Sequence, residues 1–522
     1  METKHKIAKY AGIVIVATIF CRILGLVREV VISNKFGATI ETDAFFIAFM
    51  IPNLFRTFLG EGALNTAFIP IFAEYLTNYG RKKAEYFASN VLNILILILI
   101  IVIVLGIWGA PLLIDLMAVG FKSNSYKYEL AVNLTRIMFP YLGFVAIAAL
   151  FMSILNSYDH FLVPALAPAM LNISIIIFAF TLSLHYGIYS LAIGVILGGL
   201  GQALIQVPAL VKDKVKYKFV IDFQDPGVQK LLKLLLPAIF GLAINEVNVV
   251  VDRTIASSLV DGSISALYYA NRLVQFPLGA FGIAISIAIF PTLSKYAAED
   301  NILELKKSFL FGLRMLTFIT VPSAVGLIVL RDPIIRLIYE HGIFSKTATL
   351  MTTAALLYYS IGLFAYASLR LITMVFYALR DTKTPVKIGS FIVFLNIALD
   401  LFLVRYLAHS GLALATSVVA IINMFILLKL LPAKIGDIEW REEIYFLSKI
   451  IVATLIMAIS CIMVSNFLGG ILNLSNKVDQ LIQVLISILA GGIIYLVSSY
   501  FLGVSEIKNL KQKLKIIFRG KI

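Results

Sequence analysis

Repeated apolar runs, long enough to cross a lipid bilayer, constrain this chain most strongly. One of them, VLNILILILIIVIVLGIW at residues 91–108, contains no charged side chain. A membrane-spanning α-helix needs about 20 predominantly apolar residues, and runs of that length recur along the sequence. The mean hydropathy of +0.96 and the hydrophobic fraction of 60% exceed what a soluble domain needs. The sequence therefore predicts an all-α polytopic membrane protein.

The length rule divides the chain into about 14 membrane spans of roughly 20–30 residues each. Their expected positions are approximately 8–32, 42–60, 88–117, 130–157, 162–184, 188–211, 231–258, 265–294, 306–330, 347–378, 386–407, 411–431, 447–469 and 480–503. The first run lacks a clear small-residue cleavage site, so we interpret it as an uncleaved span. Lysines and arginines concentrate in alternate connections, as at 81–83, at 212–218 and in the tail from Lys508 to Lys521. The positive-inside rule then places both termini in the cytoplasm.

Charged side chains inside the predicted spans mark the candidate substrate site. Between Phe20 and Tyr75 these side chains are Arg22, Arg28, Glu29, Asp43, Arg56 and Glu61. A charge at the bilayer centre costs about 2.5–3.5 kcal/mol on insertion scales, so these groups must face one another, a watery cavity or a charged ligand. Arginines within the spans, which also include Arg314, are candidates for function and outnumber the acids there, which also include Glu246. This excess favours an anionic substrate over a cationic drug. Alternatively, each arginine pairs with an acid or a carbonyl and only holds helices together.

An internal repeat predicts how the spans are arranged. The segment VREVVISNKFG…FIPIFAEY, near residues 27–75, resembles VDRTIASSLVDG…IFPTLSKY, near residues 251–296. In each copy a charged pair ends one span, and two prolines follow. The copies start after an even number of spans, so they share an orientation and form a parallel repeat. We therefore expect two six-span lobes, 1–220 and 221–435, facing a central cavity, with two extra spans and a basic tail in 436–522.

A second group of polar residues has the composition of a sodium site. Asn396 and Asp400 lie four residues apart on one helix face, and Thr416 follows a short turn. Together with Asp252 of the second repeat, they offer carboxylate, amide and hydroxyl oxygens, which suit a hard cation. An Asn–Asp pair at this spacing is more often a hydrogen-bonded contact between helices. The spacing alone is compatible with both interpretations.

Motifs for nucleotide binding or catalysis do not occur in the sequence. It has no P-loop, HExxH, GxSxG or CxxC pair. Cys21 and Cys461 lie far apart in apolar runs, so we expect no disulfide framework. The net charge of +15 clusters between the spans, where it sets topology and does not indicate a nucleic-acid partner. We expect a transporter that uses no cofactor, apart from the Na⁺ considered above, rather than an enzyme.

Three long stretches resemble one known family. They are CRILGLVREVVISNKFG, TDAFFIAFMIPNLFRTFLGEGALNTAFIPIFAEY and YYANRLVQFPLGAFGIAISIAIFPTLSKY. They look like the MurJ (MviN) family of bacterial lipid II flippases, within the multidrug/oligosaccharidyl-lipid/polysaccharide exporter superfamily. The resemblance covers nearly the whole chain, including the span count.

This resemblance implies a substrate and two sites. The substrate would be lipid II, an undecaprenyl-pyrophosphate-linked disaccharide pentapeptide. Alternating access would move it from the cytoplasmic to the periplasmic leaflet for peptidoglycan assembly. The positions that match the family's central cavity are Arg22, Arg28, Glu29, Asp43, Arg56 and Arg272. The positions that match its sodium site are Asp252, Asn396, Asp400 and Thr416, with a backbone oxygen near Leu412.

The resemblance also implies a location, an energy source and partners. The protein would reside in the bacterial inner membrane, contact lipid II and membrane lipids, and meet cell-wall synthesis proteins. An ion gradient or the membrane potential would drive the cycle, and the last two spans would form a groove for the lipid tail. The alternatives are an exporter of another lipid-linked glycan, a drug/cation antiporter, a membrane glycosyltransferase and a non-transporting scaffold. A glycosyltransferase would need a carboxylate-rich external loop, whereas the predicted external loops are short.

Overall fold

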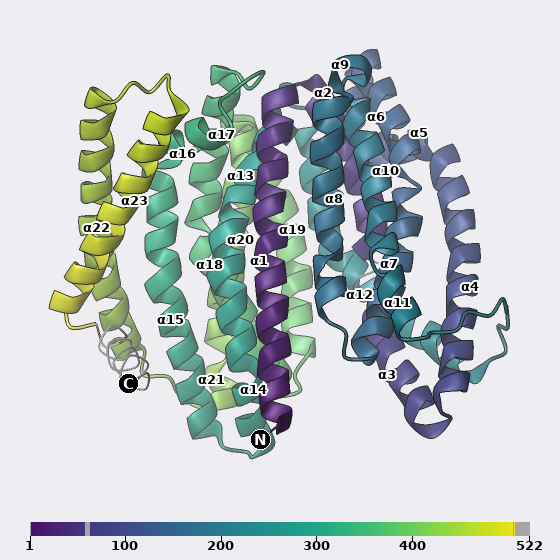
Figure 1. The fold of residues 1–522 in the computed structure, drawn as a ribbon. Helices are drawn as coiled ribbons and strands as arrows, with labels where there is room; N and C mark the ends of the chain where they lie inside the picture. The colour runs from purple at the N-terminus through teal and green to yellow at the C-terminus, as the bar shows by residue number, and fades with distance from the viewer. Residues whose placement is uncertain (1, 58–62, 505, 507–522) are drawn as a thin grey trace. The chain divides into compact units, whose positions relative to one another are not determined.

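The structure, a computed structural model, describes residues 2–57, 63–504 and 506. All regular structure within these residues is helical, which confirms the predicted all-α class (Figure 1). The chain divides into two compact units, Met1–Ser265 with Gly342–Phe344 and Ala266–His341 with Ser345–Ile522. The predicted lobe boundaries near residues 220 and 435 stay predictions.

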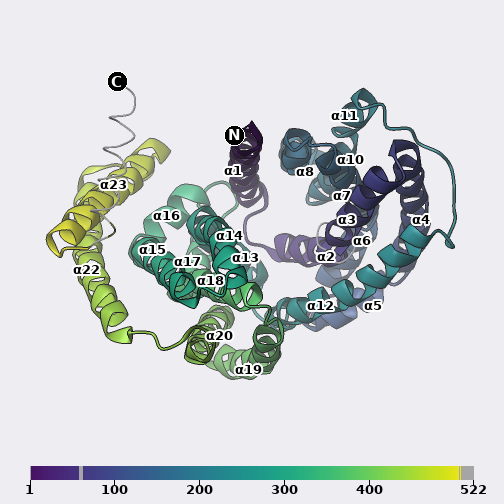
Figure 2. The ribbon, with the colours of Figure 1, turned by 90° about the horizontal axis from the view of Figure 1, so that it is seen from below.

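The first unit is a helical bundle in which α7 is the most enclosed element. Its elements are α1 (Glu2–Phe36), α2 (Ile40–Arg56), α3 (Ala63–Asn78), α4 (Arg81–Trp108), α5 (Ala110–Met117), the 3₁₀ turn η2 (Val119–Ser123), α6 (Ser125–Met138), α7 (Tyr141–Ser157), α8 (Leu162–Thr181), α9 (Ser183–Tyr186), α10 (Tyr189–Leu204), α11 (Val207–Lys212) and α12 (Pro226–Ala256). Helix α7 contacts α2, α3, α4, α8 and α10, as the view along the bundle shows (Figure 2). Its buried side chains, among them Tyr141 and Leu150, form the centre of this unit.

Small residues let two of these helices approach closely. A Cβ atom added to Gly194 of α10 would lie 2.9 Å from the Cα of Ile175 on α8. One added to Gly198 would lie 2.7 Å from the Cα of Leu171. Two glycines four residues apart on one helix face are a common device for helix packing within lipid, where no hydrophobic effect drives helices together. The α8–α10 contact therefore depends on these two positions.

The second unit contains the remaining helices. They are α13 (Ser263–Pro277), a π-helical turn η3 (Leu278–Ile283), α14 (Ala284–Ala298), α15 (Ile302–Val329), α16 (Arg331–Ile338), α17 (Lys346–Ile361), α18 (Leu363–Ala378), α19 (Lys383–Leu407), α20 (His409–Leu430), α21 (Pro432–Ile435), α22 (Trp440–Ile471) and α23 (Lys477–Phe501). Buried apolar residues of α15, α18 and α20, including Phe309, Leu371 and Met424, form its core. Helices α22 and α23 form a C-terminal hairpin that packs on α15 and α16.

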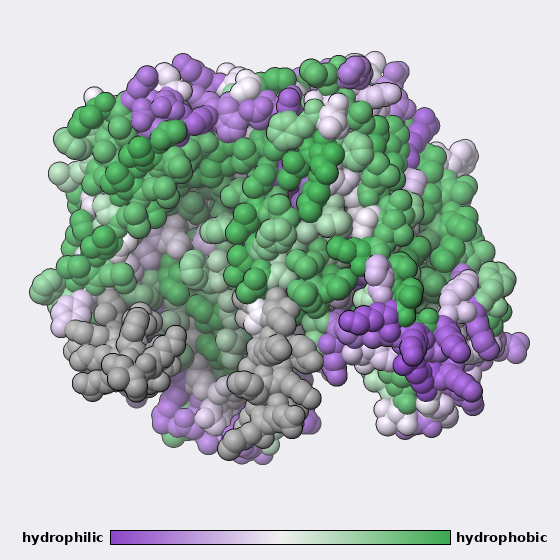
Figure 3. Space-filling view, viewed as in Figure 1, coloured by the Kyte–Doolittle hydropathy of each residue, from purple (hydrophilic) through white to green (hydrophobic). Residues whose placement is uncertain are grey.

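Ten helices of the described residues are long and apolar enough to cross a membrane, or up to eleven if the bent pair α17–α18 is one span. All of them coincide with predicted spans. The other three predicted spans fall in α1, α2 and α12, which that count does not include, so the total of 14 stays a prediction. Figure 3 shows apolar side chains over the middle of the helices and hydrophilic ones at their ends. The basic tail from Lys508 and the charged Glu61 lie outside the described residues.

The order of elements supports the predicted repeat. Helix α1 is followed by α2, which contains Pro52, and by α3, which contains Pro70. In the second copy, α12 is followed by α13, which ends at Pro277, and by α14, which contains Pro291. A π-helical turn directly follows Pro277, because a proline interior to a helix removes a backbone donor. The two-fold relation between the lobes stays a prediction.

One arginine that the sequence offers as a functional candidate links two helices instead. Arg314 of α15 donates to both carboxylate oxygens of Glu443 on α22, with Nε–O distances of 3.0 Å and an Nη2–Oε1 distance of 2.7 Å. Its guanidinium also lies 5.7 Å from the ring centroid of Phe446. A bidentate pair of this kind fixes geometry as well as charge. Arg314 therefore docks the C-terminal hairpin on α15.

The contacts of Asp381, in the turn before α19, should make the stability of the protein depend on pH. Thr384 donates its backbone N–H and its hydroxyl to Asp381, and Lys434 lies 3.1 Å from the same carboxylate. These bonds lower the pKa of Asp381 from 3.8 to about 2. Because the folded pKa lies below the unfolded value, the stabilisation is complete above about pH 4 and is lost as the pH falls toward 2. The Asp381→Asn variant should unfold at a lower temperature than the parent above pH 4, and this difference in unfolding temperature should shrink as the pH falls toward 2. A difference that stays constant over that interval would contradict the assignment.

Candidate substrate and ion sites

Arg28 and Glu29, adjacent on α1, form a buried ion pair. Arg28 Nη2 contacts Glu29 Oε1, and the two side chains are only 8% and 1% exposed. Helix α1 packs on α8, where the Asn172 amide donates to the Cys21 carbonyl at 3.2 Å. A guanidinium has five N–H donors and can bind a carboxylate and a phosphate group together. This pair therefore has the chemistry expected of an anion-binding group inside an apolar helix.

Two other predicted site arginines belong to the same unit. Arg22 is exposed on α1, and Arg56 is half-buried at the last residue of α2. The carboxyl group of Glu246 on α12 is close enough to Arg56 for a direct charge–charge interaction. An acid of α12 is thus brought near an arginine of the first sequence repeat. The sequence identified both residues but gave no means of pairing them.

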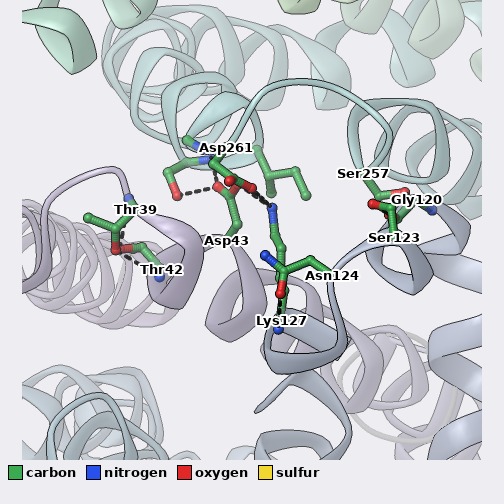
Figure 4. A network of polar contacts seen from close by, with 12 residues as sticks. Thr39, Thr42, Asp43, Gly120, Ser123, Asn124, Lys127, Ser257 and Asp261 are labelled. Atoms are coloured by element: carbon green, nitrogen blue, oxygen red, sulfur yellow. Dashed lines mark hydrogen bonds and ion pairs between the residues drawn. The ribbon is translucent and has the colours of Figure 1, made fainter. Parts of the chain in front are cut away.

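Asp43 lies at the centre of a network of polar contacts (Figure 4). Its carboxylate accepts the backbone N–H of Gly262 at 2.8 Å and that of Ser265 at 2.9 Å, and the Ser265 hydroxyl at 2.7 Å. Lys127 Nζ lies 3.0 Å from Asp43 Oδ2 and 2.8 Å from Asp261 Oδ1. Asp43 is 1% exposed. In this structure it joins α2 and α6 to the turn between α12 and α13.

Local sequence explains why these groups meet. Thr39 caps α2 in a reciprocal capping box with Thr42, which places Asp43 in the first turn, where an acid is favourable. Gly262 has a φ of +88°, and a Cβ atom there would lie 2.7 Å from the carbonyl oxygen of Ala38. Only glycine adopts this conformation readily and permits so close an approach. The turn can therefore present the Gly262 N–H to Asp43.

Lys127 is a network residue that sequence reasoning missed. It follows Asn124, whose side chain caps α6 by accepting from the Lys127 backbone N–H. Its ammonium group lies 4.5 Å from the centroid of the Phe121 ring, and its side chain is 4% exposed. The predicted span begins at residue 130, which leaves this lysine in the preceding connection. The sequence signal for this was Asn124, a favourable N-cap residue, which starts the helix earlier and so includes Lys127 in its first turn.

Arg272 belongs to the second unit. It is exposed on α13, where its Nη2 donates to the hydroxyl of Tyr268 at 2.8 Å. The guanidinium also lies over the Tyr268 ring, 5.0 Å from the centroid. Residues four apart on a helix face each other, so the tyrosine orients the guanidinium from one side. Arg272 thus has a fixed direction and an exposed charge.

The predicted sodium ligands divide between the units. Asp252 lies on α12 of the first unit, whereas the other four lie on α19 and α20 of the second, which pack against each other. The Asn396 amide donates to Asp400 Oδ2 at 2.7 Å, and both residues are buried. The Thr416 hydroxyl donates to the Leu412 carbonyl at 2.9 Å. No three His, Cys, Asp or Glu residues cluster as a metal site among the described residues, so any ion here needs amide, hydroxyl and backbone oxygens.

Comparison with known proteins identifies the family. A sequence profile described as "Lipid II flippase MurJ" matches residues 32–477. The chain belongs to the MurJ family. A probable lipid II flippase MurJ of Buchnera aphidicola subsp. Acyrthosiphon pisum is 35% identical over 93% of this chain and 96% of its own length. The corresponding protein of Vibrio cholerae is 36% identical, with 86% and 87% covered.

Solved structures agree with the MurJ assignment. A structure titled "Lipid II flippase MurJ, inward closed conformation" superposes with a TM-score of 0.79, at 34% identity, over 95% of this chain and 99% of that chain. A multidrug MATE transporter in an inward-facing conformation shares the fold, with a TM-score of 0.66 at 14% identity, over 79% and 95%. The resemblance seen in the sequence is confirmed, as is the prediction of a transporter rather than an enzyme.

Proposed function

We propose that this chain moves lipid II from the cytoplasmic to the periplasmic leaflet of a bacterial inner membrane. The observation that carries the proposal is the buried Arg28–Glu29 pair on α1 of a chain that belongs to the MurJ family. Charges inside a membrane helix are costly and are retained for function by default. A phosphate-bearing headgroup is the ligand that an arginine at this position suits best.

The headgroup is bound, in this proposal, by the arginines predicted from the sequence. Arg28, Arg56 and Arg272 bind pyrophosphate oxygens, while Arg22, which is exposed on α1, adds positive charge. Glu29 orients Arg28, and Glu246 compensates part of the positive charge of Arg56 when no substrate is bound. Release follows when the arginines separate or return to their acidic partners.

Asp43 has a different role from the one its position in the family suggested. Its carboxylate is occupied by Lys127, by the N–H of Gly262 in the α12–α13 turn, and by the N–H and hydroxyl of Ser265 at the start of α13. We propose that this network, at the end of the first unit opposite the N-terminus, holds that end closed. Opening toward the periplasm would break it, and its bonds would reform on return to the inward-open state.

The polyprenyl tail lies along α22 and α23. Their outer surfaces are apolar, with Leu455, Met463 and Leu489 all more than half exposed. A cavity of about 480 Å³ lies between α15, α20 and α22, lined by residues such as Phe425, Trp440 and Phe446. Apolar surface of this kind suits a hydrocarbon chain that stays in the bilayer while the headgroup crosses.

Transport can be tested with purified protein in vesicles that carry labelled lipid II. The label in the inner leaflet should become accessible to a membrane-impermeant reagent added outside. In protein-free vesicles only the outer-leaflet label should react. If the full chain leaves the inner-leaflet label protected, or if it scrambles an unrelated phospholipid equally fast, the proposed function is wrong.

Sodium binding is a separate proposal that Asp400→Asn tests. Asp400, Asn396, Thr416 and the Leu412 carbonyl offer the hard oxygen ligands that Na⁺ prefers, and Asp252 would complete the set. Binding stabilises the folded protein by RT ln(1 + [Na⁺]/Kd), which is about 1.4 kcal/mol at ten times Kd. We therefore expect NaCl, but not choline chloride at equal ionic strength, to raise the unfolding temperature of the parent.

The Asp400→Asn variant should lose this sodium-dependent rise. The amide preserves the shape of the side chain and can still hydrogen-bond to Asn396, so a helix contact alone would survive the change. Equal stabilisation by Na⁺ in the parent and the variant would show that the Asn396–Asp400 pair only joins residues within α19. Thr416→Val, which removes the hydroxyl group, provides a second test of the same ligand set.

A further inference from the structure

An irregular segment between α11 and α12, residues 213–225, is fixed along the side of α4. We call it the strap. The Asn90 side chain donates to the carbonyl of Asp222 and accepts its N–H, both at 2.8 Å. Asn93 donates to the Val220 carbonyl at 2.9 Å and accepts the Tyr217 hydroxyl at 2.7 Å. Side chains of α4 thus hold the strap, whose path runs past that helix in Figure 2.

The side chains of the strap that point away from α4 are of two kinds. Lysines occupy alternate positions, at 214, 216 and 218, and all three are exposed. Exposed apolar side chains follow the lysines: Phe219 is 80% exposed, Phe223 49% and Ile221 43%. A folded protein rarely leaves aromatic groups this exposed next to one another without a partner.

The strap lies where α4 enters the apolar part of the bilayer. The bonds to the strap come from the turn of α4 that contains Asn90 and Asn93, and the uninterrupted apolar run of α4 starts there. Further along α4, Val104 is 59% exposed and Trp108 82% exposed, so lipid covers this side of the helix. The exposed groups of the strap are therefore at the level of the membrane surface, at the end of the unit that holds the N-terminus (Figure 1).

The positive charge near the strap is not balanced by its acids. Arg81 pairs with Glu85 at 2.8 Å and also donates to the Asp213 carbonyl. The Asp213 carboxylate pairs with His160 at 3.0 Å, the Asp222 carboxylate accepts the Gln224 N–H at 2.8 Å, and the Asp225 carboxylate caps α12. The remaining basic side chains of this surface are exposed, and they are Lys82, Lys83, Lys212, Lys214, Lys216 and Lys218. This surface therefore has a net positive charge beside exposed aromatic rings.

We propose that the strap is a docking surface for anionic phospholipids of the leaflet on the N-terminal side. The lysines bind the lipid phosphates, and Phe219, Ile221 and Phe223 insert between the acyl chains. Interfacial lipid binding combines these two contributions, and each basic residue near an anionic surface contributes about 1 kcal/mol. A surface that only fixes topology during insertion has no need of exposed aromatic rings or of preference among lipids afterwards.

The proposal can be tested with an environment-sensitive fluorophore on the strap. Both native cysteines are replaced by alanine, Phe219→Cys is introduced, and the labelled full chain is placed in nanodiscs. Discs of phosphatidylcholine alone are compared with discs containing increasing phosphatidylglycerol. With phosphatidylglycerol, emission should shift to the blue, brominated acyl chains should quench it, and iodide should lose access. A label at Trp108→Cys should respond to brominated lipid in both kinds of disc.

Charge variants separate lipid binding from simple burial. Replacing Lys214, Lys216 and Lys218 with glutamine should raise the phosphatidylglycerol content needed for the half-maximal shift, by about five-fold in affinity per lysine. Raising the salt concentration should act in the same direction. The matched control, Lys346→Gln, removes an exposed lysine at the start of α17 and should change nothing.

The outcomes exclude one another. A label that remains open to iodide and insensitive to brominated lipid in every disc would show that the strap is solvated, and the proposal would fail. A label buried equally in both lipids and unaffected by the glutamine variants would show insertion without recognition of anionic lipid, which also contradicts it. Lipid II flipping by the labelled parent reports separately on the proposed function.

Discussion

Replacing Arg28 by alanine is expected to abolish lipid II flipping. Losing one partner of a buried, hydrogen-bonded charge pair costs about 2–5 kcal/mol, which is roughly 30-fold to several thousand-fold in a binding constant. Arg28 is the most deeply buried of the predicted phosphate-binding arginines. The rate of lipid II translocation in vesicles measures the effect, and growth of a flippase-depleted bacterium measures its consequence in the cell. The protein level in the membrane should be checked in the same cells.

A loss of activity alone would not separate substrate binding from stability. Arg28→Ala removes the Arg28 contact from the buried Glu29 carboxylate, and that destabilises the helix by itself. The double variant Arg28→Ala/Glu29→Ala removes both charges. It should recover the thermal stability of the parent while flipping stays lost. Restored flipping in the double variant would show that Arg28 serves only to neutralise Glu29.

Two further variants sharpen this prediction. Arg28→Lys keeps the charge but not the fork of donors that binds phosphate through two bonds, so it should retain only a small part of the activity. Arg272→Ala should reduce flipping without a change in stability, because the Arg272 side chain is exposed on α13. Arg405→Ala, at an exposed position near the end of α19, is the matched control and should behave as the parent. Full activity of both Arg28→Ala and Arg272→Ala would refute the assigned roles.

Hydropathy was sufficient to predict the long helices of this protein but not the partners of its charges. In lipid every backbone polar group must be satisfied within the segment, so a long apolar run has essentially one structure available to it. Arg314 shows the limit of that argument. The sequence places it inside a span as a functional candidate, but its partner Glu443 lies 129 residues later and makes it a contact between helices. The periodicity of a local segment carries no information about a contact between residues so far apart in the sequence.

The same limit applies to the candidate site. Arg28 and Glu29 are neighbours in sequence, and their pairing could be anticipated from that alone. Asp43 was identified as a charge that must be compensated, yet its actual partners depend on the Gly262 turn and on where α6 begins. A helix start is the least certain feature of a hydropathy pattern, and here a shift of a few residues moves Lys127 from a connection into the network. Compensation was therefore predictable, whereas the identity of the compensating group was not.

Asp43→Ala is expected to produce the largest loss of stability among these variants. Among the described residues, it leaves the Lys127 ammonium, which is 4% exposed, with the half-exposed Asp261 as its remaining ion-pair partner. It also removes the carboxylate acceptor of the Gly262 and Ser265 N–H groups. Removing one partner of a buried ion pair costs about 3–5 kcal/mol. Thermal unfolding measures the loss, and hydrogen exchange at residues 259–265 should become faster. Asp115→Ala breaks the more exposed pair with Lys122 and should cost about 0–1 kcal/mol.

The double variant Asp43→Ala/Lys127→Met decides what the network does. Methionine fills much of the lysine volume and leaves no buried charge, so stability should return in part. The turn would still lack its carboxylate acceptor, and hydrogen exchange there should stay fast. If the network holds one end of the transporter closed, this stable variant should spend more time open at that end. Cysteines placed on the turn should then react faster with a membrane-impermeant reagent, and an unchanged rate would show that Asp43 supports folding without controlling access.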